Sequence, residues 1–385
     1  MAVANPLDQL DLAELRQRTS TKWREYDADV LPLWVAEMDV PLADAVRDRL
    51  ERAVLSGDTG YADAGRYAAA FASFAADRWG WTGLAPERAV PVADVMRGVV
   101  EAIGVLTGTG ATVVVDAPVY PPFHTFLRAA GREVLEAPLG EGGRLDLEAL
   151  ERAFASAAAG GRGAAYLLCS PHNPTGVVHT PAELSGVAAL AAEHGVRVVA
   201  DEIHAPLVLP GATFTPYLSV PGTEAAMAVV SASKGWNLAG VKAALLVAGV
   251  EAAGDLARLP EVVSHGPSHF GVIAQTAALD EGRDWLDALL AGLQDNRRLL
   301  GELLVAHLPD VRWVPPEATY LAWLDCRALG LGPDPAAAYL ERARVALSAG
   351  GPFGTGGEGH VRLNFATSPA VLTEAVARMG RVVTS

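Results

Sequence analysis

The chain has 385 residues, of which 51% are hydrophobic and 19% charged, so it can bury a large core in one or two domains. Its net charge of −15 argues against nucleic acid or an anionic membrane as a partner, and no apolar run reaches the roughly 18 residues of a membrane span. The N-terminus lacks the basic flank and apolar core of a signal peptide, which predicts a cytoplasmic protein. The two cysteines, Cys169 and Cys326, lie far apart and predict neither a disulfide nor a metal site.

Short apolar runs alternate with Ala- and Leu-rich stretches of helical period, which is the pattern of an α/β sheet. In chain order the predicted strands are 112–115, 165–169, 196–200 and 226–230. Between them, residues 181–194 are expected to form a helix with Thr180 as N-cap and Glu183 completing a capping box. Beyond about residue 275 the pattern changes to a long helical stretch, 274–305, followed by strands at 320–325 and 361–365 around a helix at 335–343. This second part predicts a smaller α+β domain.

Each of the four predicted strands leads into a polar or Pro/Gly-rich segment. Tyr120, Asn173, Asp201 and Lys234 lie in these segments. Because ligands of open α/β sheets bind outside the carboxyl ends of the strands, we expect the four side chains to converge on one crevice.

Lys234 is the most informative of the four, because it places an amine in a Ser- and Gly-rich turn after a buried strand. A lysine held out of bulk water has a lowered pKa and can form an imine with an aldehyde. Ser231, Ser233 and Asn237 beside it are small and polar, which suits contact with an anion. Taken alone, the same pattern also fits a lysine at a solvated strand end.

Seven segments in this order resemble the fold-type I pyridoxal-phosphate (PLP) enzymes. The resemblance is closest to the cystathionine β-lyase (MalY/PatB-type C–S lyase) branch of the class I/II aminotransferases, and it extends from about residue 31 to about 367. The segments are LPLWVAEMD at 31–39, GY at 60–61, YPPF at 120–123, PHNPTG at 171–176, DEIHAPL at 201–207, SASKGWNLAG at 231–240 and VRLN at 361–364.

The resemblance implies a PLP-dependent transferase fold: a large α/β domain with a mostly parallel central sheet, and a smaller α+β C-terminal domain. Residues 1–39 would pack on the small domain and the active-site entrance, 40–275 would form the large PLP-binding domain, and 276–385 the small domain. The Gly-rich stretch 350–359 is either a surface loop, which we favour, or an active-site lid.

The resemblance also implies roles at the cofactor ring. Lys234 would hold PLP, Asp201 would face the ring nitrogen, which must stay protonated for the ring to accept electrons, and Asn173 would bind the phenolic oxygen. Tyr120 would stack on the ring. His204 would either touch the phenolic oxygen or support Asp201. A metal is not expected.

At the phosphate, the resemblance points to Ser231, Ser233 and the helix start at Gly98 and Val99, where free amides favour an anion. Lys242 stands where many aminotransferases place a phosphate-binding arginine, and it could equally be a surface residue. The remaining implied contacts are Tyr61 with the phosphate of a neighbouring subunit, which makes a homodimer with shared active sites, and substrate contacts from Arg362, Trp34, Ala36, Tyr120 and Asn173. Arg362 would pair with the α-carboxylate of an amino-acid substrate.

The expected function is a PLP-dependent carbon–sulfur β-lyase that acts by α,β-elimination on L-cystathionine or a related cysteine S-conjugate. Its products would be a thiol, pyruvate and ammonia. The alternatives are a class I/II aminotransferase, and a cysteine-S-conjugate lyase or deaminase of natural-product biosynthesis. A non-catalytic regulatory protein is a further alternative, against which the intact Lys, Asp, Asn and Arg set argues.

Overall fold

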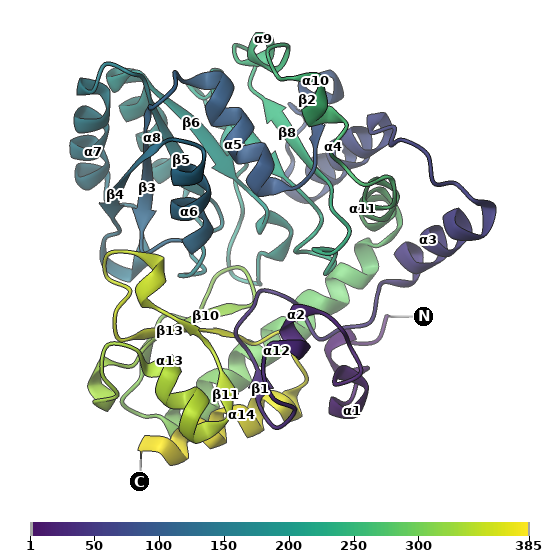
Figure 1. Ribbon diagram of the computed structural model, residues 1–385, viewed down its shortest axis with the longest axis vertical. Coiled ribbons are helices and arrows are strands. Elements are labelled where there is room, and N and C mark those ends of the chain that lie inside the picture. The colour runs from purple at the N-terminus through teal and green to yellow at the C-terminus, as the bar shows by residue number, and fades with distance from the viewer. Residues whose placement is uncertain (1–2, 384–385) are drawn as a thin grey trace.

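The computed structural model describes residues 3–383, and its largest feature is a seven-stranded sheet with the order β2-β8-β7-β6-β5-β3-β4 (Figure 1). β8 runs antiparallel to both of its neighbours, whereas the other pairs are parallel. The mostly parallel sheet and the four predicted strands are thereby confirmed. The strands are β2 (Ala89–Val92), β3 (Thr112–Ala117), β4 (Glu133–Pro138), β5 (Ala164–Cys169), β6 (Val196–Asp201), β7 (Met227–Val230) and β8 (Ala244–Ala248).

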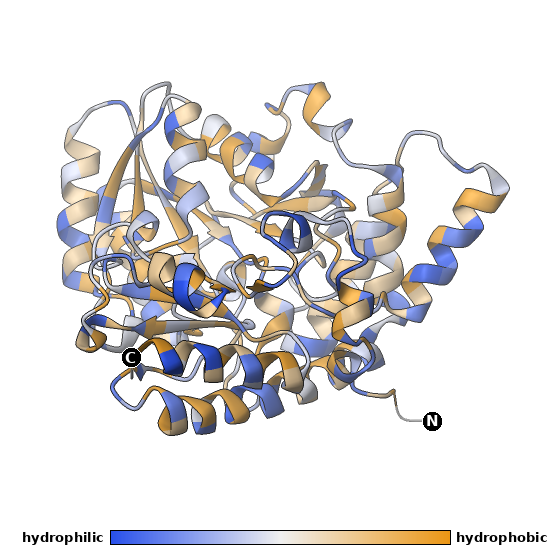
Figure 2. Ribbon diagram, turned by 60° about the horizontal axis from the view of Figure 1, so that its bottom comes forward, coloured by the Kyte–Doolittle hydropathy of each residue, from blue (hydrophilic) through white to orange (hydrophobic). Residues whose placement is uncertain are grey.

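Helices cover both faces of this sheet, because successive side chains of a strand point to opposite faces. In β3, Val113 and Val115 join the core on one face, whereas Val114 joins the core on the other. Figure 2 shows the result: the strands are hydrophobic along their length, and the outer helices carry a hydrophilic stripe. The covering helices are α5 (Val95–Leu106) and α6 (Pro121–Ala129) on the first face and α7 (Leu147–Ala159) and α8 (Pro181–His194) on the second.

The predicted helix at 181–194 is α8, and its start has the predicted capping box. The Thr180 hydroxyl accepts the N–H of Glu183 at 3.2 Å, and the Glu183 carboxylate accepts the N–H of Thr180 at 2.7 Å. Gly195 ends the helix in the left-handed conformation, with φ 66°. The chain then enters β6, which ends at Asp201.

A second, antiparallel sheet with the order β12-β13-β10-β9 forms the smaller domain. The predicted helical stretch 274–305 is two helices, α11 (His269–Glu281) and α12 (Arg283–His307), interrupted at Gly282. The expected division after residue 275 falls inside α11, so we propose Gly282 as the boundary between the domains. The other elements here are β9 (Arg312–Trp313), β10 (Leu321–Asp325), α13 (Pro335–Ala338), β12 (Ser348–Ala349), β13 (His360–Asn364) and α14 (Pro369–Val383), which packs along α12.

The N-terminal segment lies beside the small domain in Figure 1. β1 (Leu31–Pro32) pairs in parallel with β11 (Val345–Ala346), and this contact supports the proposal that residues 1–39 pack there. None of the described helices is long and apolar enough to cross a lipid bilayer. The remaining helices are α1 (Leu12–Leu15), α2 (Thr21–Arg24), α3 (Asp44–Ser56) and α4 (Gly65–Trp79), the last two against α11, and the short α9 (Ala253–Leu256) and α10 (Glu261–Ser264).

Candidate active site

A cavity of about 300 Å³ lies outside the carboxyl ends of β5, β6 and β7. Asn173 lines it from the turn after β5, Asp201 from the end of β6 and Lys234 from the turn after β7. Tyr120, the residue that precedes α6, also lines it. The structure therefore brings all four predicted strand-end residues to one crevice.

Lys234 lies in this cavity with its amine close to the N-terminal segment. Its Nζ donates a hydrogen bond to the carbonyl of Ala36 at 2.7 Å, and the side chain is only partly exposed. Burial lowers the pKa of Lys234 to about 8, and the positive charge of Arg362 acts in the same direction. Near neutral pH a useful fraction of this amine is therefore unprotonated and nucleophilic.

Asp201 is 4% exposed and faces the cavity from the end of β6. Its Oδ1 accepts the N–H of Ile203 at 3.1 Å. Burial raises the pKa of Asp201 to about 7, against the opposing effects of this hydrogen bond and of Lys234. Glu202, the next residue, turns away from the cavity, and its Oε1 accepts the N–H of Tyr217 at 2.6 Å. A cation placed opposite Asp201 would stabilise its carboxylate.

His204 is buried in the wall of the same cavity. Burial lowers its pKa to about 3, and the positive charges of Lys234 and Arg362 contribute. The imidazole is therefore neutral, and its Nδ1 has no hydrogen-bond partner among the described residues. His204 thus gives the cavity wall a neutral, buried imidazole, and its predicted contact with the phenolic oxygen or support of Asp201 stays a prediction.

Arg362, in β13, is a buried cation without a carboxylate partner in the described part of the chain. Its guanidinium donates to Asn173 Oδ1 at 3.0 Å, to the carbonyl of Trp34 at 3.1 Å and to Ser348 Oγ at 3.1 Å. Burial lowers the pKa of Arg362 to about 10, which still leaves it protonated at neutral pH. A buried charge held only by neutral groups is a binding site for an anion.

The predicted phosphate contacts at Gly98 and Val99 stay a prediction that the cavity does not support, because neither residue lines it. Val99 is fully buried, and a Cβ on Gly98 would lie 2.8 Å from Val229 Cγ1, so these two residues pack α5 against the sheet. The first turn of the same helix lines the cavity instead. Its lining residues are Asp94, Val95 and Met96, which the N-cap signal of an Asp before a helical run could have identified.

Lys242 also lines the cavity, where its Nζ pairs with Asp94 Oδ2 at 2.6 Å. Burial opposes the ionisation of Asp94, but the hydrogen bonds from Lys242 and from the N–H of Arg97 outweigh it and lower the pKa of Asp94. The pair places a cation beside the start of α5. The surface alternative for Lys242 is thus only half right, since the side chain is exposed and also borders the cavity.

Ser233 lines the cavity, but Ser231 does not. The Ser231 hydroxyl is buried and hydrogen bonded to the carbonyl of Ala243 at 2.9 Å and to Gln275 Oε1 at 2.8 Å. It also accepts the N–H of Ser233 at 3.1 Å, so it shapes the turn that carries Lys234. The geometry therefore does not support the expected direct contact between Ser231 and the phosphate.

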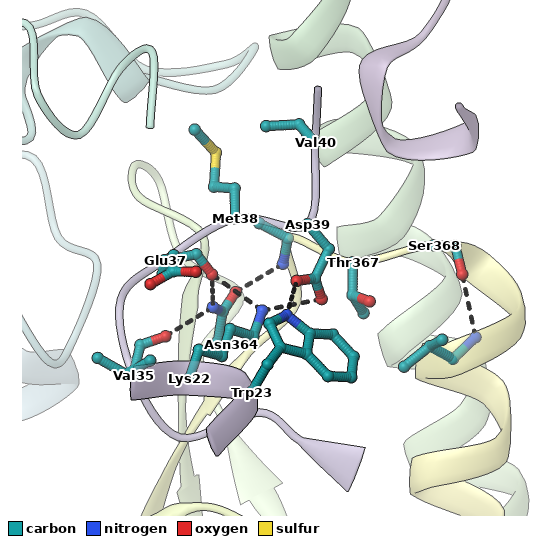
Figure 3. Close-up of polar contacts among 12 residues, drawn as sticks. Lys22, Trp23, Val35, Glu37, Met38, Asp39, Val40, Asn364, Thr367 and Ser368 are labelled. Atoms are coloured by element: carbon teal, nitrogen blue, oxygen red, sulfur yellow. Dashed lines mark hydrogen bonds and ion pairs between the residues drawn. The ribbon is translucent and has the colours of Figure 1, made fainter. Parts of the chain in front are cut away.

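The segment 34–39 runs as a strap between Lys234 and Arg362, and Figure 3 shows how one end of it is held. Asn364 Nδ2 donates to the carbonyls of Val35 and Glu37, at 2.8 and 2.7 Å. Lys22, fully buried, donates to the carbonyl of Glu37 at 2.9 Å and pairs with Asp39 at 2.8 Å. The strap places Ala36 in the cavity, whereas Trp34 lines an adjoining hollow that also contains Arg362.

Tyr61 does not reach this cavity within one chain. It is 95% exposed, and its ring lies 6.3 Å from that of His265. It borders a separate hollow together with Arg49 and Arg66. The predicted contact with a neighbouring subunit stays a prediction.

Comparison of the chain with known proteins identifies its family. The family model of class I and II aminotransferases matches residues 29–379. The chain belongs to the class I and II aminotransferase family.

Within this family, the chain resembles cystathionine β-lyases. A protein of Mycobacterium leprae (strain TN) named "Putative cystathionine beta-lyase" is 57% identical, over 99% of this chain and 98% of its own. The cystathionine beta-lyase of Corynebacterium glutamicum is 34% identical, over 97% of this chain and 99% of its own. A "putative plp-dependent beta-cystathionase" from Corynebacterium diphtheriae is 36% identical over 98% of this chain and 99% of its own, and its crystal structure matches with a TM-score of 0.92.

The cofactor of this chain, as a member of the family, is PLP, and the residues of the cavity fit that cofactor. Asp201 is a buried carboxyl that a nearby cation would stabilise, and the protonated ring nitrogen of PLP requires such a carboxylate opposite it. Lys234 is an amine of lowered pKa that can bind an aldehyde. The free amides at the start of α5, with Lys242 beside them, suit a phosphate.

Proposed function

We propose that this protein is a carbon–sulfur β-lyase that cleaves L-cystathionine or a related cysteine S-conjugate by α,β-elimination. The observation that carries the proposal is the arrangement of three groups at adjoining cavities: the Lys234 amine, the buried Asp201 carboxyl and the unpaired Arg362 guanidinium. Bound PLP would supply an aldehyde for the substrate amine and a ring that withdraws electrons from the substrate Cα.

Arg362 would receive the α-carboxylate of the substrate. Its two Nη atoms are held by Asn173, Trp34 and Ser348, so the guanidinium is oriented before a substrate arrives. Asp201 would stay ionised opposite the ring nitrogen, and the strap would exclude water from one side of Lys234. These positions fix the substrate with its Cα toward the lysine.

Lys234 would act as the base. Its neutral amine takes the Cα proton, and the electron pair left behind forms the Cα–Cβ double bond as the Cβ–S bond breaks. The sulfur leaves with the bonding pair and takes up a proton to become the thiol. The remaining aminoacrylate adds water and gives pyruvate and ammonia.

The test is an assay of the PLP-loaded protein with L-cystathionine and no added 2-oxo acid. We expect homocysteine, pyruvate and ammonia in equal amounts, and no products from Lys234→Ala. Turnover that requires an added 2-oxo acid and leaves the C–S bond intact would show an aminotransferase instead.

We also propose a homodimer in the cytoplasm, with Tyr61 completing the partner's phosphate site. The near-complete exposure of Tyr61, beside a hollow of about 810 Å³ lined by Arg49 and Arg66, supports the dimer. Two free, buried cysteines suit a reducing compartment. Sedimentation velocity should give twice the 40.1 kDa chain mass, and a monomer that binds PLP fully would contradict the shared site.

A further inference from the structure

The Gly-rich segment 350–359, expected to be a loop or a lid, is attached to the large domain at two places. Phe353, at the end of the short 3-10 helix Gly351–Phe353, is buried, and its carbonyl accepts the N–H of Val119 at 2.8 Å. Two residues later, the N–H and the hydroxyl of Thr355 both donate to Glu136 Oε2, at 3.1 and 2.5 Å. The segment is thus clasped to the large sheet, because Glu136 belongs to β4.

Glu136 is well suited to hold this segment. Its second oxygen lies 2.8 Å from His124 Nε2, so both carboxylate oxygens are engaged. Burial opposes its ionisation, but the hydrogen bonds from Thr355 and His124 outweigh burial and lower the pKa of Glu136, which keeps it an anionic acceptor. Gly354 has φ 96°, and a Cβ there would clash with the carboxylate, so only glycine lets the chain approach so closely.

Phe353 links this clasp to Arg362. The guanidinium carbon of Arg362 lies 5.2 Å from the centre of the Phe353 ring, in a cation–π contact. Trp323 also packs against the Phe353 ring, and the centres of these two rings are 5.0 Å apart. Phe353 also lines the hollow of about 510 Å³ that Trp34, Tyr120 and Arg362 share. A shift of this segment would therefore move a group in direct contact with the guanidinium.

We propose that Glu136 is a positioning residue for substrate binding: by holding Thr355 it keeps Phe353 against Arg362 and so fixes the guanidinium that receives the substrate carboxylate. This inference rests on the proposed function, which gives Arg362 that task. Neither Glu136 nor Thr355 lines the cavity that contains Lys234, so the effect falls on substrate binding rather than on proton transfer.

The test uses a matched pair of substitutions at the exposed Thr355. Thr355→Val keeps the shape and loses the hydroxyl, whereas Thr355→Ser keeps the hydroxyl. In the PLP-loaded enzyme we expect Thr355→Val to raise KM for a cysteine S-conjugate about tenfold, as for the loss of one hydrogen bond to a charged group, with kcat little changed. Thr355→Ser should behave as wild type, and so should Glu133→Gln, an exposed control on the same strand.

Hydrogen exchange supplies a readout that does not depend on activity. Thr355→Val and Glu136→Ala should speed exchange in peptides from 350–359 and leave β4 and β10 unchanged, and the two KM effects should be strongly non-additive when combined. Unchanged KM together with faster local exchange would overturn the positioning role.

Arg362→Lys separates this inference from the proposed function. If Arg362→Lys raises KM and Thr355→Val does not, the clasp alone is wrong. If Arg362→Lys leaves KM unchanged, the proposed carboxylate site is wrong, and the positioning role falls with it.

Discussion

Lysine occurs at only three positions in this chain, and the structure gives each a different environment. Lys22 is fully buried in an ion pair with Asp39, and Lys242 is exposed and paired with Asp94. Lys234 differs from both because its hydrogen bond goes to a carbonyl, that of Ala36, and it has no ion pair with a carboxylate among the described residues. The pKa of Lys234 falls because burial and the charge of Arg362 outweigh the opposing charges of Glu37 and Asp201, neither of which forms an ion pair with the amine.

This difference predicts a pH dependence for labelling of the PLP-free protein. Lys234 should react with an amine-acylating reagent with a midpoint near pH 8, because the protonated amine below that pH is not nucleophilic. Arg362→Met should move the midpoint upward, because it removes a charge that lowers the pKa. Peptide mass spectrometry resolves the three lysines. A midpoint in the ordinary lysine range, about 10.4, would contradict the buried environment.

Asp201 and Glu202 are adjacent buried carboxyls, but only the side chain of Asp201 faces the cavity. Substitutions at the two positions therefore form a matched test. Asp201→Asn should lower kcat by about 10²- to 10³-fold, as for the loss of one electrostatic contact to the reacting system, while PLP remains bound. Glu202→Gln should retain activity, because burial raises the pKa of Glu202 to about 8 and its neutral form already serves as an acceptor for Tyr217. Steady-state kinetics with an absorbance check of PLP content measures both. Equal losses in the two variants would refute the assignment.

At the scale of elements, helix α5 shows why Gly98 is a packing residue. Gly98→Ala places a methyl group 2.8 Å from Val229 and should destabilise the fold by about 1–3 kcal/mol. Gly104→Ala in the same helix has no atom closer than 3.9 Å and should stabilise it by up to about 1 kcal/mol. Denaturant unfolding of the PLP-free protein compares them. A Gly98→Ala variant of normal stability that has lost PLP affinity would favour the original phosphate prediction.

The strap at 34–39 depends on a buried ion pair, shown in Figure 3. Lys22→Met leaves Asp39 buried with only the indole N–H of Trp23 and should cost about 3–5 kcal/mol of unfolding free energy. Arg47→Gln removes a comparable ion-pair network on the surface of α3 and should be almost neutral. Chemical denaturation measures the free energies. The strap has two further anchors, Asn364 and Asn237, and the amide of Asn237 bonds to both the N–H and the carbonyl of Met38, at 2.8 and 3.0 Å. A small effect of Lys22→Met would mean that these two residues hold the strap without the ion pair.

At the scale of the whole molecule, the sequence predicted what repeated local patterns encode. Short apolar runs located β3, β5, β6 and β7. The residues at or after their ends located Asn173, Asp201 and Lys234, because parallel strands end on one side of a sheet. Roles that depend on the direction in which a side chain points could not be predicted from the sequence. Ser231 and Ser233 are both serines in the turn before Lys234, so the sequence does not distinguish them. The hydrogen bonds of Ser231 to Ala243 and Gln275 show that its side chain points away from the cavity.

Contacts between segments far apart in the chain were also outside the reach of local patterns. Ser348 and Phe353 meet Arg362 only because β12 and the Gly-rich segment fold beside β13. The pairing of Lys22 with Asp39 likewise requires a turn of the N-terminal segment that no periodicity marks. The predicted division of the chain near residue 275 stays a prediction, and α11, which continues through that point, is the reason we propose Gly282 instead.

We propose that Lys234 both holds PLP and serves as the proton carrier of an elimination reaction. The most direct measurement is borohydride reduction of the PLP-loaded protein followed by peptide mapping, which the presence of only three lysines makes unambiguous. We expect the pyridoxyl group on Lys234 alone. A pyridoxyl group on Lys22 or Lys242, or a protein that is unmodified after loading, would contradict it.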